Sequence, residues 1–440
     1  PEFYHAQAMH MPTYDKPRII CCAEDFPNYI GLPRGSADDI VTLLVENKIR
    51  YTVSDKRNRG KPQKFAFQGK LRPEQEKAAI ALLKNDLGVL SASTAFGKTV
   101  VAIYLLAKRA TNTLILVHRV QLLNQWKSRL ENFLGIPPSE IGIIGSGKRK
   151  PTGIIDVASI QSLVKKGVVD DIVGNYGMVI ADECHHLSAF SFESVIRQCK
   201  CQYVLGLSAT LTRKDGHHPI IFMQCGPVRY RVNDKQQALE RPFDHRVIIR
   251  PTELTLPPEQ QEKITIHTIY DLLIHDDARN RMIVEDVRAA LLHGRNPVVI
   301  TERKEHLFWL ENAFADVKPL FVMRGGMRRK ELTSILQAFS AVPEGTPRLL
   351  LATGKFLGEG FDDPRLDTLF LTMPISWKGT LAQYAGRLHR LYDRKTEVII
   401  YDYADLKITM TMRMFERRVA GYRAIGYRIT DDNAQYLFPE

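Results

Sequence analysis

Residues 91–99, SASTAFGKT, constrain the fold more than any other part of the chain. An apolar run, GVLSAS, leads into them, and a helical pattern, VVAIYLLAKRA, follows. A strand, a tight loop and a helix that opens at Gly97-Lys98-Thr99 form the arrangement in which backbone N–H groups cradle phosphate. Although Ala92 replaces the usual first glycine, the pattern predicts a P-loop rather than an ordinary strand-to-helix turn. The residues predicted to bind the nucleotide there are Thr94, Ala95, Phe96, Gly97, Lys98 and Thr99.

Apolar β-branched runs alternate with helical spans over two successive stretches of the chain. The first stretch contains GVLSAS, TLILVH, IIDVAS, GMVIAD and YVLGLSA, and the second contains NPVVIT, PLFVM, RLLLAT, TLFLTM and EVIIYD. Strands separated by helices predict parallel sheets with crossover helices, hence an α/β fold of two lobes. A proline-rich stretch separates the lobes, and the arginine-rich run 411–429 has helical spacing. We expect domains at 65–233 and 251–440, joined by a linker at 234–250.

A smaller block precedes the first lobe, within residues 1–64. It reads as strand (PRIICCAE), helix (ADDIVTLLVENKI) and strand (RYTVSD), so we expect a small α+β domain that closes with the basic run KRNRGKPQK. The chain opens with Pro1 rather than Met, which suggests a piece of a longer polypeptide or complex.

The overall composition points to a polyanionic partner. The chain has 440 residues, with 61 Lys and Arg against 49 Asp and Glu, a net charge of +12. Neutralising phosphates with such side chains releases counterions, so the excess favours nucleic acid. Six cysteines without paired CxxC knuckles favour reduced thiols over a disulfide framework or a structural zinc. No run is long enough to span a membrane and no signal peptide opens the chain, so we expect an intracellular protein without a membrane partner.

A second chemical motif follows the apolar run MVIA, where a predicted strand ends in Asp182-Glu183. A carboxylate at the tip of a strand near the P-loop strand can hold Mg²⁺, and the next can orient or deprotonate a water. We assign Asp182, with Thr99, to the metal and Glu183 to the water. Cys184, His185 and His186 could suggest zinc, but three consecutive residues cannot all reach one ion.

With these motifs the chain resembles superfamily 2 helicases, whose fold is a pair of tandem RecA-like domains. Leu71-Arg72-Pro73-Glu74-Gln75 resembles the element before the P-loop, Asp182-Glu183-Cys184-His185 the DExH motif, and Ser208-Ala209-Thr210 motif III. Thr353-Gly354 through Gly358-Glu359-Gly360-Phe361-Asp362 resembles motif V, and Gln383-Tyr384-Ala385-Gly386-Arg387-Leu388-His389-Arg390 resembles motif VI. The resemblance runs from Leu71 to His389 and implies ATP and Mg²⁺ as cofactors.

The resemblance also assigns roles. It makes Gln75 the adenine contact, adds Gly360 and Asp362 to the nucleotide site, and places Gln383, Arg387 and Arg390 with the catalytic residues. Two arginines at i and i+3 share one helix face, and Arg390 is the better arginine-finger candidate. Residues expected to couple hydrolysis to movement are Ser208, Thr210, Arg213 and Asp215. Candidates for the sugar-phosphate backbone are His118, Arg119, Ser159, Gln161, Thr301, Arg303 and Thr353, although His118 and Arg303 could equally serve surface salt bridges.

Residues 205–216, LGLSATLTRKDG, resemble the XPB-like DNA helicases and the UvsW-like enzymes. The XPB triplet Arg-Glu-Asp reads Arg213-Lys214-Asp215 here, so a base replaces its central acid. The N-terminal block resembles the damage-recognition-like domain of that group. The resemblance implies 3′-to-5′ movement on single-stranded or branched duplex DNA and a place in DNA repair. The alternatives are a double-strand DNA translocase that does not separate strands, an RNA helicase of the DExH type, and an ATP-binding module without turnover.

Overall fold

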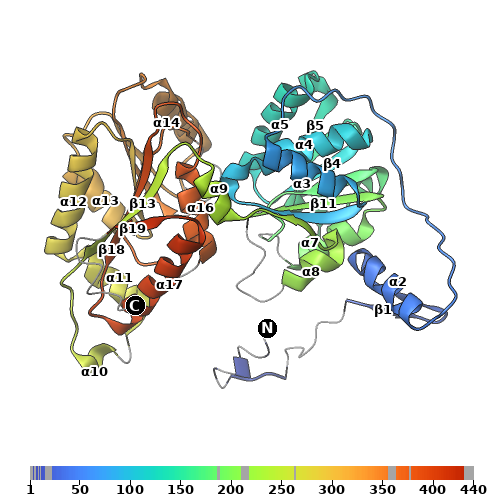
Figure 1. Cartoon of the computed structure of the whole chain (residues 1–440), viewed down its shortest axis with the longest axis horizontal. Coiled ribbons are helices and arrows are strands. Elements are labelled where there is room, and N and C mark those ends of the chain that lie inside the picture. Colours follow the sequence, from blue (N-terminus) through green and yellow to red (C-terminus); the bar gives the residue numbers. More distant parts are fainter. Residues whose placement is uncertain are drawn as a thin grey trace. The chain divides into compact units, whose positions relative to one another are not determined.

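The computed structural model describes residues 3, 6–7, 9, 11–14, 22–185, 189–209, 218–261, 264–354, 363–375 and 378–430. The chain divides into two compact units, unit 1 at Pro1–Val232 and unit 2 at Asn233–Glu440 (Figure 1). None of the described helices combines the length and apolarity that crossing a lipid bilayer requires.

Unit 1 is built on a mainly parallel sheet. Among its described residues the sheet has eight strands in the order β12-β3-β11-β10-β4-β7-β5-β6, and only the β5–β6 pair is antiparallel. The strands are β3 (Leu87–Ser91), β4 (Thr113–Val117), β5 (Ile141–Gly145), β6 (Lys148–Lys150), β7 (Ile155–Ser159), β10 (Met178–Ala181), β11 (Tyr203–Ser208) and β12 (Val228–Arg231). A small hairpin pairs β8 (Val164–Lys165) with β9 (Val168–Val169).

Helices cover both faces of this sheet, which explains its continuous apolar strands. One face packs against α3 (Pro73–Leu83), α4 (Lys98–Arg109) and α5 (Val120–Leu134). The other packs against α6 (Ile160–Leu163), α7 (Ala189–Gln198) and α8 (His218–Cys225). Neighbouring strand residues alternate between the two cores, as Leu90 and Val89 do, and both are fully buried. Short 3₁₀ turns complete the unit: η1 (Arg34–Ser36), η2 (Thr94–Phe96), η3 (Pro138–Glu140) and η4 (Asp171–Asn175).

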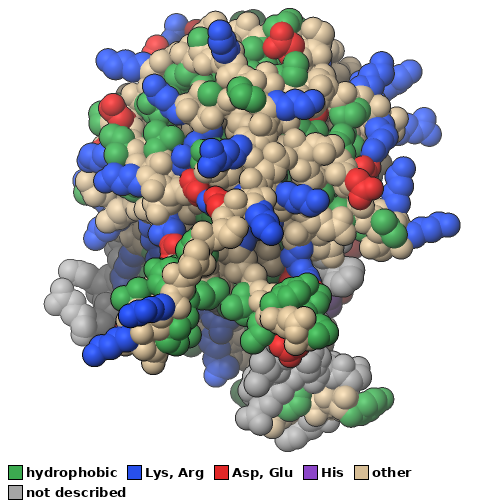
Figure 2. All heavy atoms as spheres, turned by 90° about the vertical axis from the view of Figure 1, so that its right-hand side faces the viewer, with side chains coloured by type: hydrophobic (Ala, Val, Ile, Leu, Met, Phe, Trp, Pro, Cys, Tyr) green, Lys and Arg blue, Asp and Glu red, His purple; other side chains and the backbone are tan. Residues whose placement is uncertain are grey.

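The N-terminal block differs from the strand-helix-strand pattern expected for it. Strands β1 (Glu24–Phe26) and β2 (Tyr29–Gly31) form an antiparallel hairpin, and α2 (Ala37–Glu46) confirms the expected helix. Residues 50–55 form no strand because they pair with no neighbour among the described residues, and most of PRIICCAE lies outside those residues. Exposed hydrophobic side chains gather here, at the lower end of the face in Figure 2; they include Tyr29, Ile30, Leu43 and Val45.

Unit 2 repeats the architecture with a fully parallel sheet. Its described strands are seven, in the order β15-β16-β14-β17-β18-β13-β19. They are β13 (Asp244–Pro251), β14 (Pro297–Thr301), β15 (Leu320–Met323), β16 (Leu349–Thr353), β17 (Thr368–Leu371), β18 (Glu397–Ala404) and β19 (Arg428–Thr430). One face packs against α14 (Arg329–Ala341), α16 (Lys378–Leu388) and α17 (Thr409–Ala424), the other against α12 (Asp277–Leu292) and α13 (Lys304–Ala313).

Three short helices complete unit 2: α9 (Asp234–Leu239), α10 (Pro258–Gln261) and α11 (Ile266–Ile274). The two tandem parallel α/β units confirm the predicted fold class. The expected linker at 234–250 differs from the structure, because α9 and most of β13 occupy it and β13 pairs with β18 along eight residues. The helical pattern at 411–429 also ends early, at Ala424, and its last residues enter β19.

Candidate nucleotide site and nucleic-acid contacts

The P-loop follows β3 and turns into α4 through one residue with a left-handed backbone. Gly97 has φ +87°, and a Cβ there would lie 2.6 Å from Gln75 Nε2, so this position requires glycine. Gln75, on α3, donates from Nε2 to the Phe96 carbonyl at 2.7 Å and accepts the Arg72 N–H at 2.9 Å. The Arg72 guanidinium also donates to the Phe96 carbonyl. The start of α3 therefore holds the loop in place, and the side-chain amide of Gln75 is committed to that task in this structure.

Lys98 opens α4 with its side chain 6 % exposed. Its ammonium donates to the Ala92 carbonyl at 2.9 Å, so the side chain folds back over the loop that precedes it. The same Nζ lies 3.4 Å from Glu183 Oε1. This contact joins the start of α4 to the residue pair that follows β10, and β11 alone separates β10 from β3 in the sheet. The structure thus brings together Lys98 and the Asp182-Glu183 pair, as the sequence predicts.

Asp182 sits at the end of β10 with both carboxylate oxygens engaged. Oδ1 accepts the Glu183 N–H at 3.0 Å, and Oδ2 accepts the indole N–H of Trp126 at 2.7 Å. Trp126 belongs to α5 and is 2 % exposed. Sequence reasoning missed this residue, since nothing in its local pattern distinguishes it from a core aromatic side chain. Its hydrogen bond fixes the orientation of the carboxylate.

Glu183 adopts a left-handed backbone conformation with φ +45°, which is strained for a non-glycine residue. Its Oε2 accepts the Ala209 N–H at 3.4 Å, so the side chain reaches the end of β11. His185 Nδ1 lies 3.4 Å from Glu183 Oε2 and 2.8 Å from the hydroxyl oxygen of Ser208. His185 and Ser208 thereby connect the carboxylate pair to the motif III strand, and His185 is a second residue to which sequence reasoning assigned no such role.

Two carboxylates lie close together at the end of β10. Burial, followed by the neighbouring Glu183 charge, raises the pKa of Asp182 to about 6. The carboxylates of Asp182 and Glu183 both lie near the ammonium of Lys98. A divalent cation bound beside them would offset carboxylate charge, and carboxylate and hydroxyl oxygens are the ligands that Mg²⁺ prefers. Asp182 and the Thr99 hydroxyl at the start of α4 are oxygen donors of this kind, so the residues present fit such an ion. Among the described residues no group of three or more His, Cys, Asp or Glu side chains is placed to hold a metal ion, Cys184 is fully buried in the core, and His186 lies outside those residues.

Candidate nucleic-acid residues of unit 1 follow β4 and β7, two neighbouring parallel strands. Gln161 Nε2 donates to the His118 carbonyl at 3.2 Å, which joins the two loops. Ser159 is 2 % exposed and its hydroxyl oxygen lies 2.6 Å from that of Ser162. Arg119 is half-buried, and burial lowers the pKa of its guanidinium. One edge of the sheet carries His118, Arg119, Ser159 and Gln161. The Ser159 hydroxyl is buried, so it is directed into the protein.

In unit 2 the corresponding residues follow β14 and β16. Thr301 is fully buried and its hydroxyl oxygen accepts the Arg303 N–H at 3.3 Å. Arg303 pairs with Asp271 of α11. Its guanidinium therefore forms the surface salt bridge that the sequence analysis gave as the alternative to a nucleic-acid contact. Thr353 ends β16 and is 9 % exposed.

The residues that end or follow β14 and β16 meet helix α16 beside these strand ends. Tyr384 Oη, from α16, donates to Glu302 Oε1 at 3.0 Å. A Cβ on Gly354 would lie 2.1 Å from that hydroxyl, so glycine is required for the close approach. The contact holds α16 against the residues that follow β14, and sequence reasoning assigned no role to Tyr384 or Glu302.

The motif VI residues lie at the end of α16, with one correction. Gln383 is 9 % exposed and Arg387 is half-buried, both within the helix. The helix ends at Leu388, so Arg390 lies in the following turn and does not share a helix face with Arg387 as predicted. Lys395 explains the early end, because its ammonium donates to the carbonyls of Leu388 and Arg390 at 2.8 and 3.0 Å. Thr210, Arg213, Asp215, Gly360 and Asp362 lie outside the described residues.

The P-loop and the Asp182-Glu183 pair both lie within a part of the chain that matches a known family. Residues 68–213 match the family described as the res subunit of type III restriction enzymes. The chain is 26 % identical over 402 residues to a putative ATP-dependent RNA helicase of Acanthamoeba polyphaga mimivirus, covering 86 % of this chain and 71 % of that protein. It is 25 % identical over 388 residues to the DNA 3′-5′ translocase XPB2 of Sulfurisphaera tokodaii, covering 79 % of this chain and 84 % of that protein.

A solved structure supports the fold. The type ISP restriction-modification enzyme LlaBIII bound to DNA superposes with a TM-score of 0.59 at 15 % identity, covering 84 % of this chain and 32 % of that chain. The P-loop, the DExH pair and two parallel α/β units together define a nucleic-acid-dependent ATPase of the helicase class. Within that class, the chain resembles superfamily 2 helicases, the XPB2 translocase of Sulfurisphaera tokodaii among them.

Proposed function

We propose that this helicase hydrolyses ATP to move 3′-to-5′ along DNA and that it unwinds or remodels branched or damaged duplexes, as in DNA repair. The observation that carries the proposal is the cluster of Lys98, Asp182 and Glu183 at two strand ends, where Lys98 Nζ lies 3.4 Å from Glu183 Oε1. The similarity to an archaeal DNA 3′-5′ translocase supports the direction, and the net charge of +12 supports a polyanionic track.

In this proposal each residue at the end of β3 and β10 has one task. Lys98 and the loop from Thr94 to Gly97 bind the phosphates of ATP, and Thr99 and Asp182 would hold Mg²⁺. Mg²⁺, when bound, would offset negative charge on the phosphates of ATP. Glu183 orients the attacking water, and its contacts with Ala209 and His185 keep the carboxylate in position.

Further residues complete the proposed reaction cycle. Arg390, with Arg387 and Gln383, stabilises charge that develops on the γ-phosphate, and Gly360 and Asp362 contribute to nucleotide binding. Gln75 contacts adenine; because its amide also holds the Phe96 carbonyl, nucleotide binding and loop position are coupled. Four residues couple ATP hydrolysis to movement along the nucleic acid: Ser208, Thr210, Arg213 and Asp215.

The proposed nucleic-acid contacts carry no sequence information. The candidates are His118, Arg119, Ser159, Gln161, Thr301, Arg303 and Thr353. Contacts of this kind with sugar and phosphate position a strand without reading its bases, as a motor that passes every sequence requires. Arg303 reaches a phosphate only if its ion pair with Asp271 opens.

A strand-displacement assay tests the direction and the substrate together. We expect ATP-dependent displacement from a duplex with a 3′ single-stranded tail and little from the same duplex with a 5′ tail. Glu183→Gln serves as the matched control, since it keeps the shape of the side chain and removes its charge. Preferential displacement from the 5′-tailed duplex would contradict the proposed direction.

Two alternatives give distinct outcomes in the same experiment. A translocase that does not separate strands would show DNA-stimulated ATP hydrolysis without displacement on either tail. An RNA helicase, the activity named for the mimivirus relative, would be stimulated by RNA more than by DNA.

A further inference from the structure

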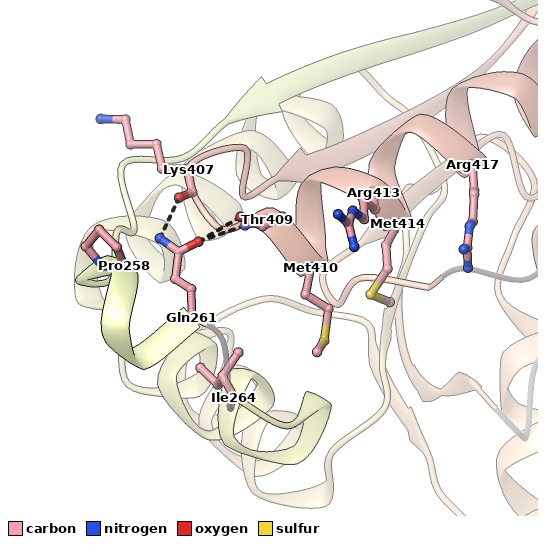
Figure 3. Close-up of a pocket in the computed structure, with 9 residues that line it drawn as sticks. All are labelled: Pro258, Gln261, Ile264, Lys407, Thr409, Met410, Arg413, Met414 and Arg417. Carbon is pink, nitrogen blue, oxygen red and sulfur yellow. Dashed lines mark hydrogen bonds between the residues drawn. The ribbon is translucent and has the colours of Figure 1, made fainter. Parts of the chain in front are cut away.

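A groove in unit 2, which we call the α17 groove, lies between α10, the residue Ile264 and the first half of α17 (Figure 3). Its volume of about 760 Å³ is within the range of ligand sites in proteins. Gln261 builds one wall: its Nε2 donates to the Lys407 carbonyl at 3.3 Å, and its Oε1 accepts the Thr409 N–H at 3.1 Å. The groove is therefore fixed by hydrogen bonds between α10 and the start of α17.

The α17 side of the groove alternates apolar and cationic side chains. Met410, Arg413, Met414 and Arg417 follow the spacing i, i+3, i+4, i+7, which places them along one helix face. The opposite face is buried and anchored, because Arg418 forms a bidentate ion pair with Asp402, with distances of 2.8 and 2.9 Å. Packing of the core thus holds the helix while the groove face remains accessible.

The two groove arginines differ from most arginines of unit 2. Both are exposed, and neither forms an ion pair or hydrogen bond with any described residue. Arg246, Arg250, Arg288 and Arg303, by contrast, each pair with a carboxylate. The ammonium of Lys407 pairs with Glu253 and points away from the groove in Figure 3. The groove therefore presents two uncompensated guanidinium groups beside methionine and isoleucine side chains.

This composition suits a single-stranded nucleic acid. Guanidinium groups bind phosphates through planar, charge-assisted hydrogen bonds, and flexible thioether side chains adapt to the apolar faces of bases. An acidic peptide could meet the arginines as well, but the position of the groove favours nucleic acid.

The groove lies at the same edge of the sheet as the proposed backbone contacts. It follows the carboxyl ends of β13 and β18, while Thr301 and Thr353 end β14 and β16, and all these strands are parallel. Helix α11 connects the two regions, since Ile264 precedes it and its Asp271 pairs with Arg303. A strand of nucleic acid that passes Thr301 and Arg303 could continue over α11 to the groove.

We infer that the α17 groove binds a single strand of nucleic acid, with phosphates on Arg413 and Arg417 and a base against Met410 and Met414. The inference rests on the proposed function and extends its track beyond the helicase motifs. Binding there is independent of sequence, since the groove offers charge and apolar surface but few base-reading groups.

Binding of fluorescein-labelled oligo-dT to the full chain, followed by anisotropy across a salt series, tests the groove. Each phosphate contact to single-stranded DNA contributes about 0.7 to the slope of log K against log salt. We expect Arg413→Ala with Arg417→Ala to lower that slope by roughly 1.4 and the affinity at low salt about tenfold. Arg413→Lys with Arg417→Lys should keep the slope.

A matched control removes two exposed arginines elsewhere in unit 2, Arg281 on α12 and Arg423 on the far part of α17, and lowers the net charge equally. An equal loss of slope in this control and in the groove variant would overturn the inference, as would an unchanged slope in the groove variant. Met414→Glu should weaken binding by a similar factor.

ATP hydrolysis separates this inference from the proposed function. Without nucleic acid, the groove variant and wild type should hydrolyse ATP at the same rate. If wild type shows no stimulation by any nucleic acid, the proposed function and the groove both fail. If wild type is stimulated but the groove variant binds oligo-dT like wild type, the groove alone fails.

Discussion

Replacing Asp182 by Asn should stabilise unit 1 even as it ends ATP hydrolysis. Asp182 is 7 % exposed, and burial together with Glu183 raises its pKa to about 6 from the ordinary value of 3.8. A carboxyl group with a raised pKa in the folded state binds protons more tightly folded than unfolded. Its contribution therefore favours the folded protein at low pH, and stability is lost as the pH rises from about 4 to about 6.

The magnitude follows from the same two values. Each unit of difference between the two pKa values lowers the free energy of unfolding by roughly 1.4 kcal/mol once Asp182 is ionised. Ionised Asp182 therefore destabilises the nucleotide-free protein by on the order of 2 to 3 kcal/mol at pH 8. Asparagine keeps an oxygen for the Trp126 hydrogen bond and carries no charge. We expect Asp182→Asn to raise the free energy of unfolding by about 2 kcal/mol at pH 8 and by about half as much at pH 5.

Urea unfolding of the nucleotide-free protein in EDTA measures this gain. Of the 3 tryptophans, Trp126 alone belongs to unit 1, so Trp309→Phe and Trp377→Phe leave a reporter for that unit. The comparison is made in this background, with Asp182 retained in one protein and the Asp182→Asn substitution added in the other. A lower free energy of unfolding for Asp182→Asn at pH 8, or a gain that does not shrink at pH 5, would refute the reasoning.

Three further substitutions test the contacts around the site and the core of unit 2. Trp126→Phe removes a hydrogen bond to a charged group, worth about 1.5 to 3 kcal/mol. ATP hydrolysis by this variant should need an at least about tenfold higher Mg²⁺ concentration for half of its maximal rate. An unchanged Mg²⁺ titration would contradict a positioning role for Trp126. Gly97→Ala places a Cβ against Gln75 at φ +87° and should lower ATP hydrolysis at least about tenfold while circular dichroism stays unchanged. Arg418→Met leaves Asp402 buried without its partner and should destabilise unit 2 by about 3 to 5 kcal/mol in urea unfolding followed by Trp309 fluorescence; a change below about 1 kcal/mol would contradict it.

Local patterns predicted the strands that flank the nucleotide site. An apolar β-branched run followed by a glycine and a helical pattern is a short-range signal, and β3, β4, β7, β10 and β11 were all expected within a few residues of their observed ends. The fold class followed from the same alternation. The roles of Lys98, Asp182 and Glu183 were inferred from their place at strand ends, and the structure brings the three side chains together.

Contacts between distant residues could not be predicted in this way. Trp126 and Asp182 are 56 positions apart, and Tyr384 and Glu302 are 82 apart, so no periodicity links them. Strand β13 was mistaken for a linker because the proline-rich stretch around it suggested a boundary, whereas its pairing with β18 depends on residues about 150 positions later. The end of α16 before Arg390 depends likewise on Lys395, which caps the helix from the following turn.

The most direct test of the account is ATP hydrolysis by wild type and Lys98→Ala with single-stranded DNA, duplex DNA and RNA. The arrangement of Lys98 against Ala92 and Glu183 predicts turnover that DNA stimulates in wild type and that stays at background in the variant with every nucleic acid. Equal turnover by the two proteins would contradict the assignment of the nucleotide site.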